Sequence, residues 1–172
     1  MSRTDLPSRR IVVGIDGSAT AELALRWAVT DAADRGGAVE AVAVREPDAL
    51  LPGTSYTFQP RGRRPVTDDS GTRAYLRAAI AAVAAAVPHA GDVPVTETVR
   101  AGDPAGELIT ASERADLLVV GSHRRGALSE MLLGSVSASC VRRARCPVVV
   151  VPAGLAHTRE HAGETGTGAE DR

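Results

Sequence analysis

The residues from Asp116 to Ser137 combine the groups that proteins use to bind phosphate. An apolar run, Leu117 to Val120, is typical of a strand buried on both faces, and it stops at Gly121. A cationic loop, His123 to Gly126, comes next. A glycine and two hydroxyls then stand near the expected start of a helix, namely Gly134, Ser135 and Ser137. Main-chain N–H groups at such a turn can surround phosphate oxygens, so the segment predicts a phosphate site.

Asp16 is the second candidate group, and it follows the apolar run Ile11 to Val13. Gly17 permits a turn, and Ser18 is well placed to cap a helix that has Glu22 in its first turn. Asp16 is therefore expected at the carboxyl end of a strand. In an open parallel sheet, ligands bind at that end of the strands.

Each of these residues also has a purely structural interpretation. Asp16 can be a turn residue before a glycine, and Ser18 can be only a helix cap. Gly134 can permit close helix packing, and the two hydroxyls after it can bond back to their own helix. The charged loop 123–125 can simply be solvated. Cys140 is expected in the core, as free cysteines commonly are.

Apolar segments that alternate with helical patterns define the rest of the fold. Besides the two runs above, strands are expected at residues 39–44, 93–99 and 148–151. Pro94 suits an edge strand better than a central one. Strands separated by helices require crossover connections, so the sequence predicts an α/β fold with a mostly parallel sheet covered on both faces.

Helices are expected between these strands. One begins near Thr72, and Asp103 followed by proline is the signal for the start of another, short helix. In the last helix, Leu133, Val136 and Cys140 recur at helical spacing. Basic residues near its end are favourable beside the carbonyl end of the helix dipole.

The length of 172 residues and the hydrophobic content of 44% suit one domain with a full core. We place this domain at residues 10–152, after a flexible leader (1–9) and before a disordered tail (153–172). The connection 47–71 is long for a compact domain, and it is interpreted as a functional lid or as a mobile loop without a ligand role.

Composition excludes several classes of partner. A net charge of -1 and an aromatic content of 2% do not favour nucleic acid as a partner. No apolar segment is long enough to span a bilayer. The spacing of Cys140 and Cys146 matches neither a zinc pair nor a redox CxxC motif, so two free thiols in a reducing cytoplasm are expected.

The segment first described resembles the nucleotide signature of the universal stress protein family, G-x(2)-G-x(9)-G-[S/T]. Gly121, Gly134 and Ser135 occupy the first, third and last marked positions, whereas Arg124 stands where the signature has its second glycine. Three more segments resemble the family in the same order, namely IVVGIDGSATAELALRWA, GDPAGELI and ARCPVVVVP. The resemblance spans about residues 9 to 152.

The resemblance implies a Rossmann-like fold, with an open five-stranded parallel sheet in the strand order 3-2-1-4-5. It further implies an ATP site in which the first strand and its turn border the adenine and ribose, while the glycine–serine segment holds the phosphates. The implied contacts are Gly14, Ile15, Asp16, Ser18, Val44, Val120, Gly121, Arg124, Gly134, Ser135, Val136 and Ser137. Mg²⁺ would accompany the phosphates, bound mainly by phosphate oxygens and water, because magnesium seldom uses an all-protein cage. The sequence shows no dedicated metal cluster.

The resemblance thus predicts an ATP-binding stress-response regulator that is not an enzyme, although slow ATP hydrolysis stays open. No GxSxG, HExxH or Walker lysine motif is present. A homodimer through the edge strand Val148 to Val151 is expected, since unpaired valines at an edge favour association. Arg124 either weakens ATP binding or replaces a main-chain contact with a side-chain one. The alternative function is an interaction module of the same fold that does not bind nucleotide.

Overall fold

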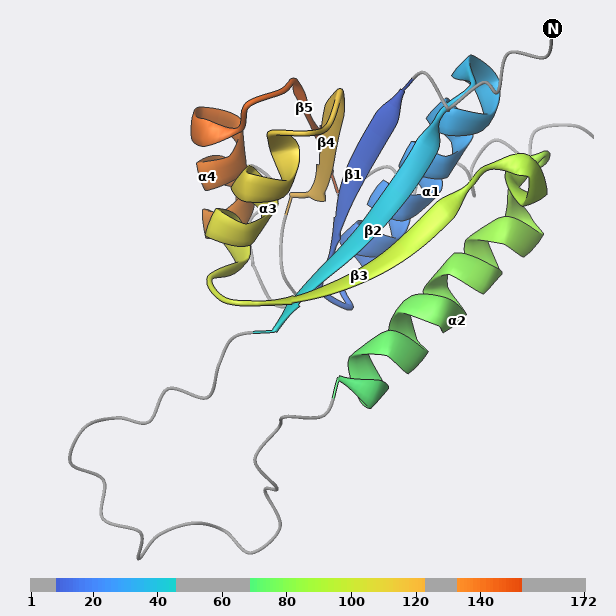
Figure 1. The fold of residues 1–172 in the computed structure, drawn as a ribbon, viewed down its shortest axis with the longest axis horizontal. Coiled ribbons are helices and arrows are strands. Elements are labelled where there is room, and N and C mark those ends of the chain that lie inside the picture. Colours follow the sequence, from blue (N-terminus) through green and yellow to red (C-terminus); the bar gives the residue numbers. More distant parts are fainter. Residues whose placement is uncertain (1–8, 46–68, 123–132, 153–172) are drawn as a thin grey trace, which may run out of the picture.

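A computed structural model describes residues 9–45, 69–122 and 133–152. Within them, five parallel strands form one sheet in the order β3-β2-β1-β4-β5, as predicted (Figure 1). The elements, in chain order, are β1 Arg10–Ile15, α1 Ala19–Arg35, β2 Ala38–Arg45, α2 Ser70–Ala86, η2 Ala90–Asp92, β3 Val95–Ala101, α3 Pro104–Ser112, β4 Leu117–Gly121, α4 Ser135–Arg143 and β5 Val148–Val151.

The sheet is covered on both faces, which gives two separate hydrophobic clusters. Ile11 and Val13 of β1 pack with α1 and α2, whereas Val12 between them packs with α3 and α4. Successive side chains of a strand point to opposite faces, so a strand buried on both faces reads as a continuous apolar run. This explains why β1 and β4 could be recognised from sequence. In Figure 1, α3 and α4 lie side by side, and both pack against the same face of the sheet.

The two edge strands are β3 and β5. The edge position that Pro94 predicts for the third strand is therefore confirmed. Along β5, Val148 to Val150 are half-buried and Val151 is buried. The valine-rich edge of β5 thus keeps part of its apolar surface accessible in the single chain.

The helix starts follow the sequence signals, with one exception. The Ser18 side chain caps α1 by accepting a hydrogen bond from the Ala21 N–H (3.2 Å), and the Asp103 side chain caps α3 by accepting one from the Gly106 N–H (2.8 Å). Leu133, which the sequence pattern places in the last helix, lies before its start at Ser135 and is 48% exposed. That assignment was wrong because apolar spacing alone does not fix where a helix begins.

The predicted place of Cys140 in the core is confirmed. It is buried and packs with Val12 and Leu118 between α4 and the sheet. Burial raises the pKa of the Cys140 thiol to about 11, with a smaller contribution from the negative charge of Asp103. Cys146 is also a free thiol. Burial, followed by the charge of Asp116, raises its pKa as well. Both thiols are therefore protonated at neutral pH.

Several predictions concern segments outside the described ranges. Most of the leader (1–9), nearly all of the 47–71 connection, the tail (153–172) and Arg124 belong to them. Over the ranges that are described, none of the helices has both the length and the apolar character needed to cross a lipid bilayer.

Candidate functional site

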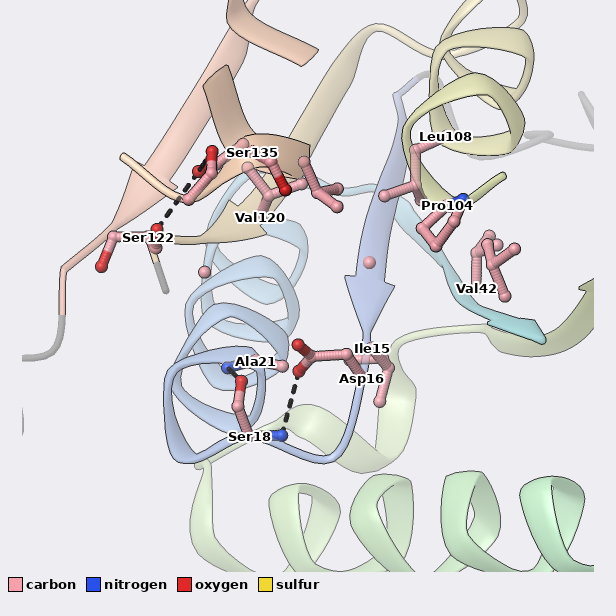
Figure 2. Close-up of a pocket in the computed structure, with 16 residues that line it drawn as sticks. Ile15, Asp16, Ser18, Ala21, Val42, Pro104, Leu108, Val120, Ser122 and Ser135 are labelled. Atoms are coloured by element: carbon pink, nitrogen blue, oxygen red, sulfur yellow. Dashed lines mark hydrogen bonds between the residues drawn. The ribbon is translucent and has the colours of Figure 1, made fainter. Parts of the chain in front are cut away.

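The candidate site is a cavity of about 400 Å³ at the carboxyl ends of β1 and β4. These strands pair in parallel, with Val13 beside Val119. The chain leaves β1 toward α1 on one face of the sheet, and α4, which follows β4, lies on the other face. Such a divergence between neighbouring strands opens a crevice. The predicted convergence of Asp16 with the segment after Val120 is therefore present (Figure 2).

The cavity brings together every predicted site residue that the structure describes. Those from β1 and its turn are Gly14, Ile15, Asp16 and Ser18. Those from the other elements are Val44, Val120, Gly121, Gly134, Ser135, Val136 and Ser137. Of the predicted set, only Arg124 lies outside the described residues.

The turn after β1 is fixed by hydrogen bonds that start helix α1. The Ser18 N–H donates to Oδ1 of Asp16 (2.9 Å), and the Ser18 and Thr20 hydroxyls lie 3.0 Å apart. Gly17, between Asp16 and Ser18, has φ +79°, a left-handed conformation that favours glycine. Asp16 is thus a turn residue and also part of the cavity wall, so its structural and functional interpretations are compatible. Its carboxylate is turned toward Ser18 in Figure 2.

One end of the cavity is apolar. Val42, Pro104 and Leu108 gather there, opposite Ser122 and Ser135 (Figure 2). A Cβ atom on Gly14 would lie 2.9 Å from Cδ1 of Leu108, so glycine at this position allows α3 to approach β1 closely. The main chain of β2 runs on past its last pair with β1, Ala43 with Ile15. Val44 can therefore present main-chain groups as well as its side chain to a flat ligand.

The other end of the cavity is formed by the start of α4. Gly134 is the N-cap residue, and no side chain among the described residues caps this helix. The Gly134 N–H donates to the carbonyl of Ser122 (2.7 Å). The N–H groups of the first helical turn, from Ser135 on, have no acceptor inside the helix, because no helical carbonyl precedes them. The N-terminus of a helix that is free of a side-chain cap is suited to an anion.

The hydroxyl of Ser137 has a structural role. It is buried and donates to the carbonyl oxygens of Gly134 (2.9 Å) and Ser122 (3.2 Å). This is the bond back to its own helix that the sequence left open. Ser137 therefore offers its main-chain N–H rather than its hydroxyl to a ligand, whereas Ser135 is exposed at the cavity.

Gly121 is required by packing at the back of the cavity. A Cβ atom there would lie 2.7 Å from Oγ1 and 2.9 Å from the carbonyl carbon of Thr20. The first turn of α1 thus rests directly on the end of β4. Gly121 therefore allows the turn after β1 and the end of β4 to lie close together at the site.

The charge of the described wall is low. Asp16 is the one charged side chain among the described residues that line the cavity. In the described part of the chain, no group of three or more His, Cys, Asp or Glu side chains could hold a metal ion. The described wall thus offers one carboxylate, that of Asp16, as an oxygen donor to a cation.

Sequence reasoning missed five residues of the wall, namely Ala21, Val42, Pro104, Leu108 and Ser122. Val42 could have been inferred, since it lies two residues before Val44 on the same face of β2. Pro104 and Leu108 reach the site because α3 packs over β1 and β2, and no local pattern in the sequence signals this packing.

A profile of the universal stress protein family matches residues 7–152. Among curated relatives, a universal stress protein of Mycobacterium tuberculosis is 37% identical over 142 residues, which is 82% of this chain and 47% of that protein. Another, from Mycolicibacterium smegmatis, is 35% identical over 82% of this chain and 45% of its own length. The chain spans about half the length of these relatives.

Solved structures agree with this assignment. A universal stress protein in complex with cAMP is 27% identical with a TM-score of 0.60, over 83% of this chain and 95% of that one. A family member from Burkholderia pseudomallei is 28% identical with a TM-score of 0.58, over 84% and 96%. UspA of Lactobacillus plantarum, 19% identical with a TM-score of 0.65 over 86% and 99%, shares the fold. The chain belongs to the universal stress protein family.

Proposed function

We propose that this chain binds an adenine nucleotide, ATP with Mg²⁺, in the cavity between β1 and β4 and acts as a stress-response regulator. The observation that carries the proposal is the convergence of Asp16, Val44 and the start of α4 on one cavity. These residues come from three distant parts of the sequence. A volume of about 400 Å³ is within the usual range for small-molecule sites.

The two ends of the cavity suit the two ends of a nucleotide. The apolar end, with Val42, Pro104 and Leu108, suits the faces of a purine ring. We propose that main-chain groups of Val44, which follows the last β2 residue paired with β1, bond to the edge of the base. The first N–H groups of α4 suit phosphate oxygens at the other end. The 27% identical universal stress protein in complex with cAMP supports an adenine ligand.

The site is proposed to bind the nucleotide and not to use it in rapid chemistry. Asp16 is the one described side chain of the wall that could act as a general base, and it already accepts a hydrogen bond from the Ser18 N–H. Nucleotide occupancy would instead bias the conformation of the chain or its affinity for a partner. Slow hydrolysis is compatible with this function.

Calorimetry with the purified full chain tests the proposal. Saturable binding of ATP with Mg²⁺ is expected at one site per chain, and adenosine should compete for it because it occupies the same apolar end. Mass spectrometry of the natively purified protein should detect a bound adenine nucleotide. No binding at millimolar ATP would favour the alternative, an interaction module of this fold in which Arg124 replaces the second glycine of the signature.

We also propose a homodimer through the edge of β5. The Leu118 N–H donates to the carbonyl of Pro147, and the Ser122 N–H donates to the carbonyl of Val151. Hydrogen-bonding groups alternate along a strand, so those of Val148 and Val150 point away from β4 toward the open edge. An open edge of this kind can pair with a second copy.

Replacing Val150 with proline should therefore give a monomer. Proline removes one outward N–H group and leaves the hydrogen bonds to β4 in place. Val150→Ala is the matched control, because it removes apolar contacts but keeps the N–H group. Light scattering at micromolar concentration should show a dimer for the unmodified chain and for Val150→Ala. A monomeric unmodified chain would contradict the proposed dimer.

A further inference from the structure

The apolar end of the cavity depends on the position of helix α3. Pro104 and Leu108 of this helix gather there with Val42 of β2 (Figure 2). A flat ligand at this end would contact both α3 and β2. The separation between α3 and the sheet therefore sets the space that a base can occupy.

An ion pair joins α3 to the sheet beside this end of the cavity. Arg100 of β3 donates a hydrogen bond from Nη1 to Oε2 of Glu107 (3.3 Å), which lies in the first turn of α3. Arg100 is the register partner of Val44, so it lies beside a residue of the cavity wall. Glu107 directly precedes Leu108 in the helix. The pair thus connects α3 to β3 at the level of the cavity.

The two side chains are packed in place. Each is 31% exposed, and Nε of Arg100 is buried. A Cβ atom on Gly102 would lie 2.9 Å from Oε1 of Glu107, so the carboxylate rests directly on this glycine. The Gly102 N–H in turn donates to the carbonyl of Arg45 at the end of β2 (3.0 Å). Glu107 is therefore held between Arg100 and the segment that follows β3.

A second ion pair of the same kind lies away from the cavity. Nη2 of Arg77 in α2 lies 2.9 Å from Oε1 of Glu97 in β3. Glu97 is three residues before Arg100, so its side chain points to the opposite face of the sheet. Neither Glu97 nor its register partner, Ala41, belongs to the cavity wall. This pair also joins a helix to β3, but it is remote from the proposed ligand.

We infer that Arg100 and Glu107 are positioning residues, which hold α3 at the distance from β2 that the adenine base requires. The inference rests on the proposed adenine-nucleotide function and assigns a role to two residues outside the cavity wall. Loss of the pair lets the first turn of α3 move away from β3, and Pro104 and Leu108 move with it. The base then loses apolar contacts.

Calorimetry on the full chain with adenosine and with ATP and Mg²⁺ tests the inference. Glu107→Ala should weaken the binding of both ligands by the same factor, because they share the base. A loss of about threefold to fivefold is expected, which is within the contribution of a partly exposed ion pair. Glu107→Gln should recover most of the loss, since it keeps an oxygen that can accept the hydrogen bond from Arg100.

Two further variants separate positioning from a general loss of stability. Glu97→Ala is the matched control, because it also breaks an ion pair between a helix and β3. It should bind both ligands as the unmodified chain does, while urea denaturation should show similar small losses of stability for Glu97→Ala and Glu107→Ala. Adding Arg100→Met to Glu107→Ala should cause little further loss of affinity, because the two residues act as one pair.

The outcomes separate the inference from the proposed function. Equal affinities of Glu107→Ala and Glu97→Ala would overturn the inference and leave adenine-nucleotide binding intact. A loss confined to ATP, with adenosine unaffected, would also overturn it, and so would additive losses for Arg100→Met and Glu107→Ala. If the unmodified chain binds neither adenosine nor ATP, the proposed function fails and the inference fails with it.

Discussion

Replacing Gly121 with alanine is expected to destabilise the fold by about 1–3 kcal/mol, the usual cost of forcing an extra methyl group into a packed site. The new Cβ atom would lie 2.7 Å from Oγ1 of Thr20 and 2.9 Å from its carbonyl carbon. The hydroxyl can rotate, but the carbonyl carbon belongs to the backbone of α1. Relief of the clash therefore requires the first turn of α1 to move away from β4.

That movement should also weaken nucleotide binding. The Ser18 side chain accepts from the Ala21 N–H in the first turn of α1, and the Ser18 N–H donates to Asp16, so a shift of this turn moves Ser18 and, through it, Asp16. A loss of about 1.4 kcal/mol in contacts corresponds to a tenfold weaker affinity, and an effect of at least about this size is expected. Urea denaturation measures the first effect and calorimetry with AMP or ATP the second.

Gly91→Ala is the matched control for this experiment. A Cβ atom on Gly91 would meet no atom within 4 Å, and the residue lies in η2, outside the cavity. Its stability and nucleotide affinity should stay close to those of the unmodified chain. Equal behaviour of Gly121→Ala and Gly91→Ala would show that the contact between Thr20 and β4 constrains neither the fold nor the site.

The contact between Gly121 and Thr20 could not be predicted from the sequence alone. The position of Gly121 after an apolar run marks it as the end of a buried strand. Its physical role depends on Thr20, which is a hundred residues away in the chain. The sequence brings Gly121 close to the turn after the first strand only through the strand order, which came from the family resemblance.

Local signals were reliable where one short segment determines the structure. The caps Ser18 and Asp103 are such cases, because a side chain and the N–H group it accepts from are three residues apart. The start of α4 was less well predicted, since Leu133 fits the apolar spacing but precedes the helix. The apolar wall from α3 could not be predicted at all, because Leu108 reaches Gly14 by tertiary packing.

The two hydroxyls in the first turn of α4 also show what the sequence could not predict. Ser135 and Ser137 have the same side chain and are two residues apart, so the sequence cannot tell which one faces a ligand. Ser137 points inward and bonds to the carbonyls of Ser122 and Gly134, whereas Ser135 is exposed at the cavity. A substitution that probes the phosphate end should therefore be made at Ser135.

Changing Ser135 to aspartate is expected to have opposite effects on binding and on stability. A carboxylate in the first turn of α4 interacts favourably with the helix dipole, which should stabilise the fold by about 0.3–1 kcal/mol. The same carboxylate competes with phosphate for the first N–H groups of the helix and repels it. AMP and ATP should bind about tenfold more weakly or worse, since a like charge within about 4 Å costs on the order of 1–4 kcal/mol.

Adenosine separates this effect from general damage to the site. It has no phosphate group, so its affinity for Ser135→Asp should equal that for the unmodified chain. Ser135→Asn is the matched control, because asparagine has nearly the same shape as aspartate without its charge, and its affinity for AMP should fall far less. Thermal denaturation provides the stability readout. If Ser135→Asp binds AMP as tightly as Ser135→Asn does, the phosphate does not lie at the start of α4, and its place in the cavity must be sought on another wall.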